Sequence, residues 1–188
     1  GSTSVIVAVI DGGVQTTHPD LKGKMVSPYN AVTNGKTFKA NDHATHVAGI
    51  IAATLNTAGG AGVSPNVKIM PINVFTGDSA NMYDVANAIR YAADHDADII
   101  NMSLGGYYYS YDLHYATEYA KSKGVLIVAA AGNDDTYEET YPASLDGVIG
   151  ISATNSGDKI TQFSNYGYSI DFAAPGEGIY STINGSKY

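Results

Sequence analysis

The sequence contains no cysteine and no tryptophan, and it has only 10 lysine and arginine residues against 18 aspartate and glutamate residues. The absence of cysteine excludes disulfide bonds, thiolate nucleophiles and cysteine-ligated zinc sites. The formal net charge of −8 would repel nucleic acid, and no cluster of basic residues offsets it. We therefore expect no nucleic-acid partner.

Long apolar runs are also absent. A membrane-spanning helix needs about 18 or more consecutive apolar residues, so we expect no membrane span and no membrane partner. The N-terminal residues show no basic segment followed by an apolar one, so no signal peptide is expected among them. The composition is 44% hydrophobic and 15% charged, which is typical of a folded domain. No repeat or linker divides residues 1–188, so the sequence predicts a single domain.

Short apolar and β-branched segments predict strands, most of them buried on both faces as in a parallel sheet. These segments alternate with helical patterns, of which one begins at His43 and another is capped by Ser79 or Asn81. The predicted strands are 5–10, 67–75, 99–103, 125–131 and 148–153, with short extended pieces at 171–174 and 179–182. This alternation predicts an α/β domain of three layers, with a mostly parallel central sheet flanked by helices.

The segment 41–53 begins with helix-capping polar residues and continues into small apolar ones. It predicts a helix over residues 43–55 that places His43 at its N-terminus, and His46 follows three residues later. The apolar stripe of this helix is expected to be buried, and it consists of Ala48, Ile51, Ala52 and Leu55. A titratable side chain at the start of a buried helix is either a packed core histidine or a functional group.

Polar side chains follow the ends of three predicted strands. Asp11 follows the first strand, Ser103 the third and Asn133 the fourth. Because the carboxyl ends of parallel strands meet at one edge of a sheet, we expect these residues and His43 to border one crevice.

Two kinds of chemistry are disfavoured at this crevice. Neither G-x-x-x-x-G-K-[ST] nor G-x-G-x-x-G follows the first strand, so nucleotide binding and other organic cofactors are not expected. A metal-dependent hydrolase is an open alternative, with His43 and His46 joined by Asp11, His18 and Asp42. However, zincin histidines are four residues apart with a glutamate beside the first, and neither condition is met.

Acid–base catalysis fits the residues better. A carboxylate beside a histidine fixes the tautomer of the imidazole and stabilises its protonated form. Such a pair normally serves a hydroxyl nucleophile, and Asp11 and His43 are the candidates. The side-chain amide of Asn133, in a glycine turn after a strand, is placed to donate to a developing oxyanion. A base, an orienting carboxylate and an oxyanion donor together indicate acyl transfer.

The chain resembles the subtilisin-like serine proteases over nearly its whole length. Two segments resemble the aspartate motif, one the histidine motif, one the substrate-binding segment and one the oxyanion motif, while two more match later landmarks. In chain order they are 7–13, 18–21, 41–49, 101–106, 129–133, 163–167 and 174–176. The resemblance implies a protease that cleaves peptide or protein substrates and is secreted.

The resemblance implies a role for each matching residue. Asp11 orients, His43 is the general base, and Asn133 donates to the oxyanion. Residues 78–80 form a second edge, so the substrate adds to the enzyme as a strand. The remaining implied contacts form the S1 pocket, with one wall from Ser103, Leu104 and Gly105, the other from Ala130 to Gly132, and a floor at Thr140. That floor predicts a small or medium substrate side chain.

The serine motif of the family, of the type G-T-S-M-A, is absent from residues 1–188. Ser103 lies in the wrong context and Ser186 comes too early, so neither is taken as the nucleophile. We expect an incomplete catalytic domain, truncated at both ends, whose serine comes shortly after Tyr188. The missing C-terminal segment, as a separate or swapped chain, or a propeptide is then the expected partner. The alternative is an inactive pseudoprotease or peptide-binding fragment.

Two further departures concern single residues. Ala44 stands where the family has glycine, and Gly12 where it has serine or threonine, which predicts crowding beside the base and one hydroxyl fewer near Asp11. The resemblance also implies one cofactor, calcium, with Asp20 and Asn56 as ligands. The N-terminal segment that supplies a further ligand in the family is not among these residues.

Overall fold

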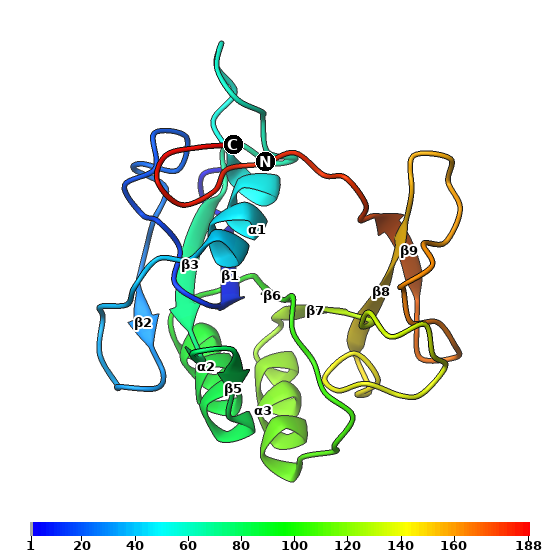
Figure 1. Ribbon diagram of the computed structural model, residues 1–188. Helices are drawn as coiled ribbons and strands as arrows, with labels where there is room; N and C mark the ends of the chain where they lie inside the picture. The colour runs from blue at the N-terminus through cyan, green and yellow to red at the C-terminus, as the bar shows by residue number, and fades with distance from the viewer. Residues whose placement is uncertain (1) are drawn as a thin grey trace.

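Seven strands form the central sheet of the computed structural model, which describes residues 2–188 (Figure 1). Every neighbouring pair in this sheet is parallel. In spatial order the strands are β2 (Tyr29–Asn30), β3 (Lys68–Asn73), β1 (Ile6–Asp11), β6 (Ile99–Met102), β7 (Leu126–Ala130), β8 (Val148–Thr154) and β9 (Phe172–Pro175). A separate antiparallel hairpin joins β4 (Phe75–Thr76) to β5 (Ser79–Ala80).

Three helices flank the sheet, and each begins at a polar cap. They are α1 (Asp42–Ala52), α2 (Met82–Asp94) and α3 (Tyr111–Ser122). α2 and α3 cover one face of the sheet, and α1 covers part of the other (Figure 1). The side chains of Asn41, Asn81 and Ser110 accept the backbone N–H groups of the first turns, which have no partner within the helix. The predicted three-layer α/β class is confirmed.

The two faces of the sheet are covered to different extents. On the α2 and α3 side, Ile10, Ile100 and Ile127 have no exposed surface, so this core extends across β1, β6 and β7. On the other side, α1 buries Val9 and Ile69 completely, but only over β1 and β3. We call this part the covered half.

The remainder of the α1 side forms the open half, where no helix of residues 2–188 packs on β7 to β9 (Figure 1). Residues paired in register across these strands point to the same side. Exposure alternates along β7 and most of β8, whereas all four residues of β9 are exposed. Leu126 is 46% exposed and Phe172 is 63% exposed. The side chains of the open half are Leu126, Val128, Ala130, Ile149, Ile151, Ala153, Phe172 and Ala174. The prediction that the strand over 125–131 is buried on both faces was therefore wrong for this chain.

Several predicted boundaries were also wrong. The first helix ends at Ala52 because Ala53 adopts φ −52° and ψ 139°, and the chain then turns so that Thr54 donates to the carbonyl of Asp20. Leu55 lies beyond the helix and is 75% exposed rather than buried. β2 was missed because it has only two residues. β5 pairs with β4 alone, so it forms an edge apart from the main sheet.

The C-terminal segment crosses from β9 to α1 as an extended strap, which includes the short extended piece predicted over 179–182 (Figure 1). The hydroxyls of Ser181 and Thr182 donate to carbonyls of α1 at 2.8 Å, and Nε2 of His46 donates to the carbonyl of Ile179 at 2.9 Å. At Gly49 a Cβ atom would lie 2.2 Å from the Thr182 hydroxyl, so only glycine allows this approach. His46 is thus half-buried and holds the strap in place.

Candidate active site

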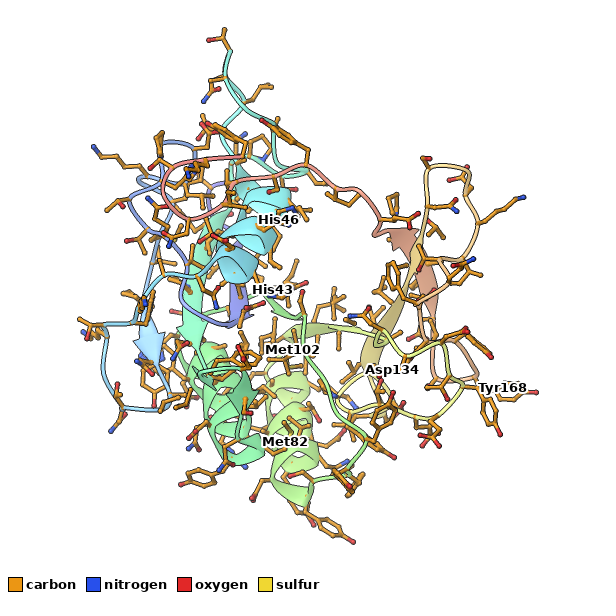
Figure 2. All side chains as sticks on the ribbon, in the orientation of Figure 1. His43, His46, Met82, Met102, Asp134 and Tyr168 are labelled. Carbon is orange, nitrogen blue, oxygen red and sulfur yellow. The ribbon has the colours of Figure 1, made fainter. Side chains whose placement is uncertain are left out.

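Asp11 and His43 form a hydrogen-bonded pair where β1 ends and α1 begins. Nδ1 of His43 lies 2.9 Å from one carboxylate oxygen of Asp11 and 2.8 Å from the other. The backbone N–H of Gly12 donates to the same carboxylate at 2.6 Å. Asp11 is buried, whereas the His43 side chain is 61% exposed. His43 lies in the first turn of α1 (Figure 2). The carboxylate therefore holds the ring at Nδ1, while the other side of the ring faces solvent.

The pair gives the imidazole the properties of a base. The hydrogen bond to Asp11 raises the pKa of His43 above its ordinary value of 6.5, against the opposing effect of partial burial. Because Nδ1 donates to Asp11, the neutral ring carries its lone pair on Nε2. A pocket of about 330 Å³ adjoins the pair and is also lined by Phe75, Asp78 and Ser103.

Gly12 and Ala44, the two positions beside the pair where the sequence departs from the family pattern, have a structural explanation. A Cβ atom at Gly12 would lie 2.1 Å from the side-chain amide of Asn41, so glycine makes room for the cap of α1. Ala44 donates its N–H to that same Asn41 side chain at 2.9 Å. The Ala44 methyl group is buried in the core of the covered half, next to Ala48. The Ala44 methyl group therefore packs between α1 and the sheet, so it does not crowd His43 as expected.

A second pocket, of about 280 Å³, brings together the residues predicted for the S1 site. Thr140 is buried there, with its hydroxyl donating to the carbonyl of Ala131 at 2.7 Å. Three residues not predicted for the site, Gly106, Tyr107 and Asp134, also line the pocket. The predicted ones are Ser103, Leu104, Gly105, Ala130, Gly132, Asn133 and Thr140. Ser103, Leu104 and Gly105 line the first pocket as well, so they form the boundary between the two pockets.

Asn133 is exposed at the edge of this pocket, and Asn165 holds the turn on both sides of it. The N–H of Asn165 donates to the carbonyl of Gly132 at 3.0 Å, and its side-chain oxygen accepts from the N–H of Asp134 at 2.8 Å. Asn165 is buried, and a Cβ atom at Gly132 would lie 2.4 Å from its amide nitrogen. Gly132 has φ +110°, which glycine alone adopts readily. The sequence showed Asn165 only as part of a landmark motif.

Neither serine considered above is engaged by His43. Oγ of Ser103 accepts from the side-chain amide of Asn101 at 3.1 Å. Oγ of Ser186 accepts from the side-chain amide of Gln15 at 3.0 Å. Within residues 2–188, no hydroxyl is hydrogen-bonded to the imidazole of His43.

The side chains of Asp20 and Asn56, the two predicted calcium ligands, are in direct contact. The amide of Asn56 donates to one carboxylate oxygen of Asp20 at 2.7 Å, and the hydroxyl of Tyr188 donates to the other at 2.7 Å. His18 is fully buried beside them, accepting from the N–H of Asp20 and donating to the carbonyl of Lys187. Across residues 2–188 no three histidine or acidic side chains gather as metal ligands. The histidine–aspartate zinc arrangement is therefore not formed there.

Comparison with known proteins agrees with this geometry. The sequence pattern of the "Subtilase family" matches residues 2–188. The chain belongs to the subtilase family. It is 44% identical to the thermophilic serine proteinase of Bacillus sp. (strain AK1) and 43% identical to thermitase of Thermoactinomyces vulgaris, covering 100% and 97% of this chain. It covers 48% and 66% of those two proteins, so it spans about half to two thirds of their length.

A solved subtilase-like structure supports the fold assignment. A protease from Pseudoalteromonas arctica superposes with a TM-score of 0.86 at 30% identity, over 93% of this chain and 64% of that one. Among the relatives is also the major intracellular serine protease of Bacillus subtilis (strain 168), at 39% identity over 98% of this chain and 62% of that protein. No helix within residues 2–188 is long and apolar enough to cross a membrane.

Proposed function

We propose that residues 1–188 are an incomplete catalytic domain of a subtilisin-type serine endopeptidase. Asp11 and His43 are two members of its triad, and the serine comes from outside these residues. The observation that carries this proposal is the contact of 2.8 to 2.9 Å between the His43 imidazole and the buried Asp11 carboxylate, beside a pocket lined by the S1 residues.

The proposed reaction follows from the proton arrangement at His43. Nε2 takes the proton of the serine hydroxyl while its oxygen attacks the carbonyl carbon of the scissile peptide bond. The carbonyl oxygen gains the negative charge and accepts a hydrogen bond from the Asn133 amide. His43 then gives its proton to the departing amine, and water hydrolyses the acyl-enzyme by the same steps. Asp11 stabilises the imidazolium each time it forms.

The proposed substrate is an extended peptide. Residues 103–105 lie between the two pockets, so one strand of substrate along them places a side chain in S1 and the preceding residues beside His43. We assign the buried Thr140, which lines this pocket, to its floor, and this assignment favours small or medium side chains there. A preference for phenylalanine or tyrosine at this position in a library of peptide substrates would refute that assignment.

The open half supports the proposed partner. The apolar surface over β7 to β9 lies on the same side of the sheet as α1 and directly beneath the S1 wall. Apolar patches of this kind mark sites that another element covers. We assign it to a segment beyond residue 188 that carries the serine, supplied by the same chain, a separate chain or a swapped copy. A propeptide is assigned instead to the substrate cleft.

The proposed calcium site rests on Asp20 and Asn56. Carboxylate and amide oxygens suit calcium, which takes six to eight oxygen ligands, so the pair supplies only part of a site. Binding requires both side chains to exchange their mutual hydrogen bond for the ion. Calcium should then raise the melting temperature of the protein, and Asn56→Ala should abolish that increase. An equal increase in both proteins would place the ion elsewhere.

The main test uses the full-length protein, including whatever follows residue 188. It should hydrolyse a peptide library, and His43→Ala should remove the activity while the melting temperature stays within a few degrees. Binding of the peptides without cleavage by the wild-type protein would favour the inactive pseudoprotease.

The secreted location is likewise a proposal, since one relative is named an intracellular protease. Immunoblotting of the culture medium and of the cells tests it.

A further inference from the structure

Six tyrosines gather next to the S1 pocket in what we call the tyrosine face. They come from the loop between β6 and α3, the first turns of α3, and the loop over 132–147. Three are largely exposed, namely Tyr108 at 88%, Tyr111 at 70% and Tyr115 at 62%. The whole set is Tyr107, Tyr108, Tyr109, Tyr111, Tyr115 and Tyr141. In Figure 1 the β6–α3 loop descends from the middle of the molecule, beside α3, to the start of α3 at the lower end of the view.

Five of the six rings are fixed by contacts with the fold. Tyr109 meets Tyr111 and Tyr141 edge-on, with ring centroids 5.2 and 5.4 Å apart. Tyr111 and Tyr115 lie one turn apart on α3, with ring centroids 6.5 Å apart and ring planes inclined by 28°. A two-way backbone bridge between Gly106 and Tyr141 joins the two loops, and Tyr107 donates to the carboxylate of Asp134. A rigid aromatic surface of this kind loses little entropy on binding.

The charges around the tyrosine face have one sign. Residues 103–116 and 132–141 contain no lysine and no arginine. They contain five carboxylates, namely Asp112, Asp134, Asp135, Glu138 and Glu139. The hydroxyl of Tyr141 donates to Glu139 at 3.1 Å, so one carboxylate lies at the hydroxyl end of that ring. The nearest lysine along α3, Lys121, is paired with Glu118 and Asp146.

We propose that the tyrosine face binds a lysine- or arginine-rich extended stretch of a protein. Basic side chains are attracted to the faces of exposed tyrosine rings and to carboxylates in the same segments. The face continues into the S1 pocket, because Tyr107 and Asp134 line that pocket. A protein held there by a basic stretch is therefore kept close to the cleft. This binding goes beyond the proposed function and needs neither the serine nor the Asp11–His43 pair.

Flat aromatic surfaces also suit sugars and proline-rich peptides, and the charge decides between them. Neither of those ligands gains from five carboxylates, whereas a basic stretch does. The recognition is electrostatic in part, so it should weaken as salt is raised.

The test is a binding measurement on the full-length protein carrying His43→Ala, which prevents cleavage of the probe. The probe is a fluorescent peptide of alternating lysine and glycine, followed by fluorescence anisotropy. A matched glutamate–glycine peptide, a proline-rich neutral peptide and a soluble glucan oligosaccharide are the comparison ligands. We expect the lysine peptide alone to bind, and its binding to weaken at high salt.

Variants locate the site. Tyr111→Ala with Tyr115→Ala should weaken binding of the lysine peptide about tenfold, as expected for the loss of two exposed cation–π contacts. The matched pair Tyr111→Phe with Tyr115→Phe keeps both rings and should retain binding within about twofold. Tyr168→Ala is the control, since Tyr168 is fully exposed but lies well away from α3 in Figure 2.

Three outcomes would overturn the proposal. Stronger binding of the proline-rich peptide or of the oligosaccharide would assign the face to that ligand. Equal binding of the lysine peptide by the alanine pair and by the parent protein would remove the face from the interaction. Equal binding of lysine and glutamate peptides would exclude recognition by charge. Melting curves of each variant exclude loss of the fold as the cause.

Discussion

The covered and open halves of the sheet, both on the side of α1, differ in how completely their apolar side chains are buried. In the covered half, Val9 and Ile69 are fully buried under α1. In the open half, Leu126 and Phe172 remain about half exposed or more. Asp11 and His43 lie at the covered half, while β7, the strand that leads to Asn133, belongs to the open half. The base and its carboxylate can therefore be in place before the nucleophile is supplied.

The turn over residues 131–134 carries Asn133, the proposed oxyanion donor, and we call it the oxyanion turn. It lies beside the open half, and contacts of its own hold its shape. Asn165 binds the turn on both sides of Asn133, and Thr140 ties the carbonyl of Ala131 from below. These contacts come from the loop side of the strands rather than from the open sheet face. The turn thus depends on buried polar contacts, whereas the Asp11–His43 pair depends on a helix packed over the sheet.

The largest effect is expected at the pair itself. Asp11→Asn keeps the size of the side chain but favours the wrong imidazole tautomer, so kcat of the full-length protein should fall about 10⁴-fold. The Michaelis constant should change little, because Asp11 is buried away from substrate. Steady-state kinetics on a peptide substrate measures both. A loss of less than about tenfold would show that Asp11 does not orient the base.

The next effect concerns the oxyanion turn. Asn133→Ala should lower kcat about 10²- to 10³-fold, as expected for loss of one oxyanion donor. Asn165→Ala should lower kcat by a smaller factor, because it acts through the position of Asn133. In the double variant the Asn165 substitution should then cost almost nothing further. Fully additive losses would mean that Asn165 acts independently of Asn133.

A pair of core substitutions compares the two halves directly. Ile69→Ala empties a fully buried site and should cost about 3 kcal/mol of unfolding free energy. Leu126→Ala should cost well under about 1 kcal/mol in the 188-residue chain, because its side chain is already partly in water. In the full-length protein the cost of Leu126→Ala should rise toward that of Ile69→Ala. Urea unfolding of both lengths tests this, and an unchanged small cost would mean that nothing covers the open half.

The smallest effect is a shift in pH dependence. Because Asp11 raises the pKa of His43 above 6.5, the base is neutral only above that raised value, and kcat/KM should fall below it. Asp11→Asn should move this fall in kcat/KM to lower pH.

Protonated His43 also stabilises the fold below pH 6.5, and this contribution to stability is lost as pH rises through the raised pKa. It should be small, since His43 is largely exposed.

The sequence predicted the catalytic edge better than the packing. Strand ends followed by polar residues placed Asp11, His43, Ser103 and Asn133 at one edge, because parallel strands share a direction. Burial on the open half could not be predicted, because an apolar strand has the same pattern whether or not a second layer covers it. The ends of α1 and the roles of Asn165 and Tyr107 depend on contacts between distant segments, which local patterns do not encode.

The central claim is that His43 activates a serine from outside residues 1–188. The most direct measurement is to treat the full-length protein with a fluorophosphonate and to map the modified residue by mass spectrometry. We predict one modified serine, located after Tyr188, and no modification in the His43→Ala variant. Modification of Ser103 or Ser186, or no modification of the wild-type protein, would contradict the claim.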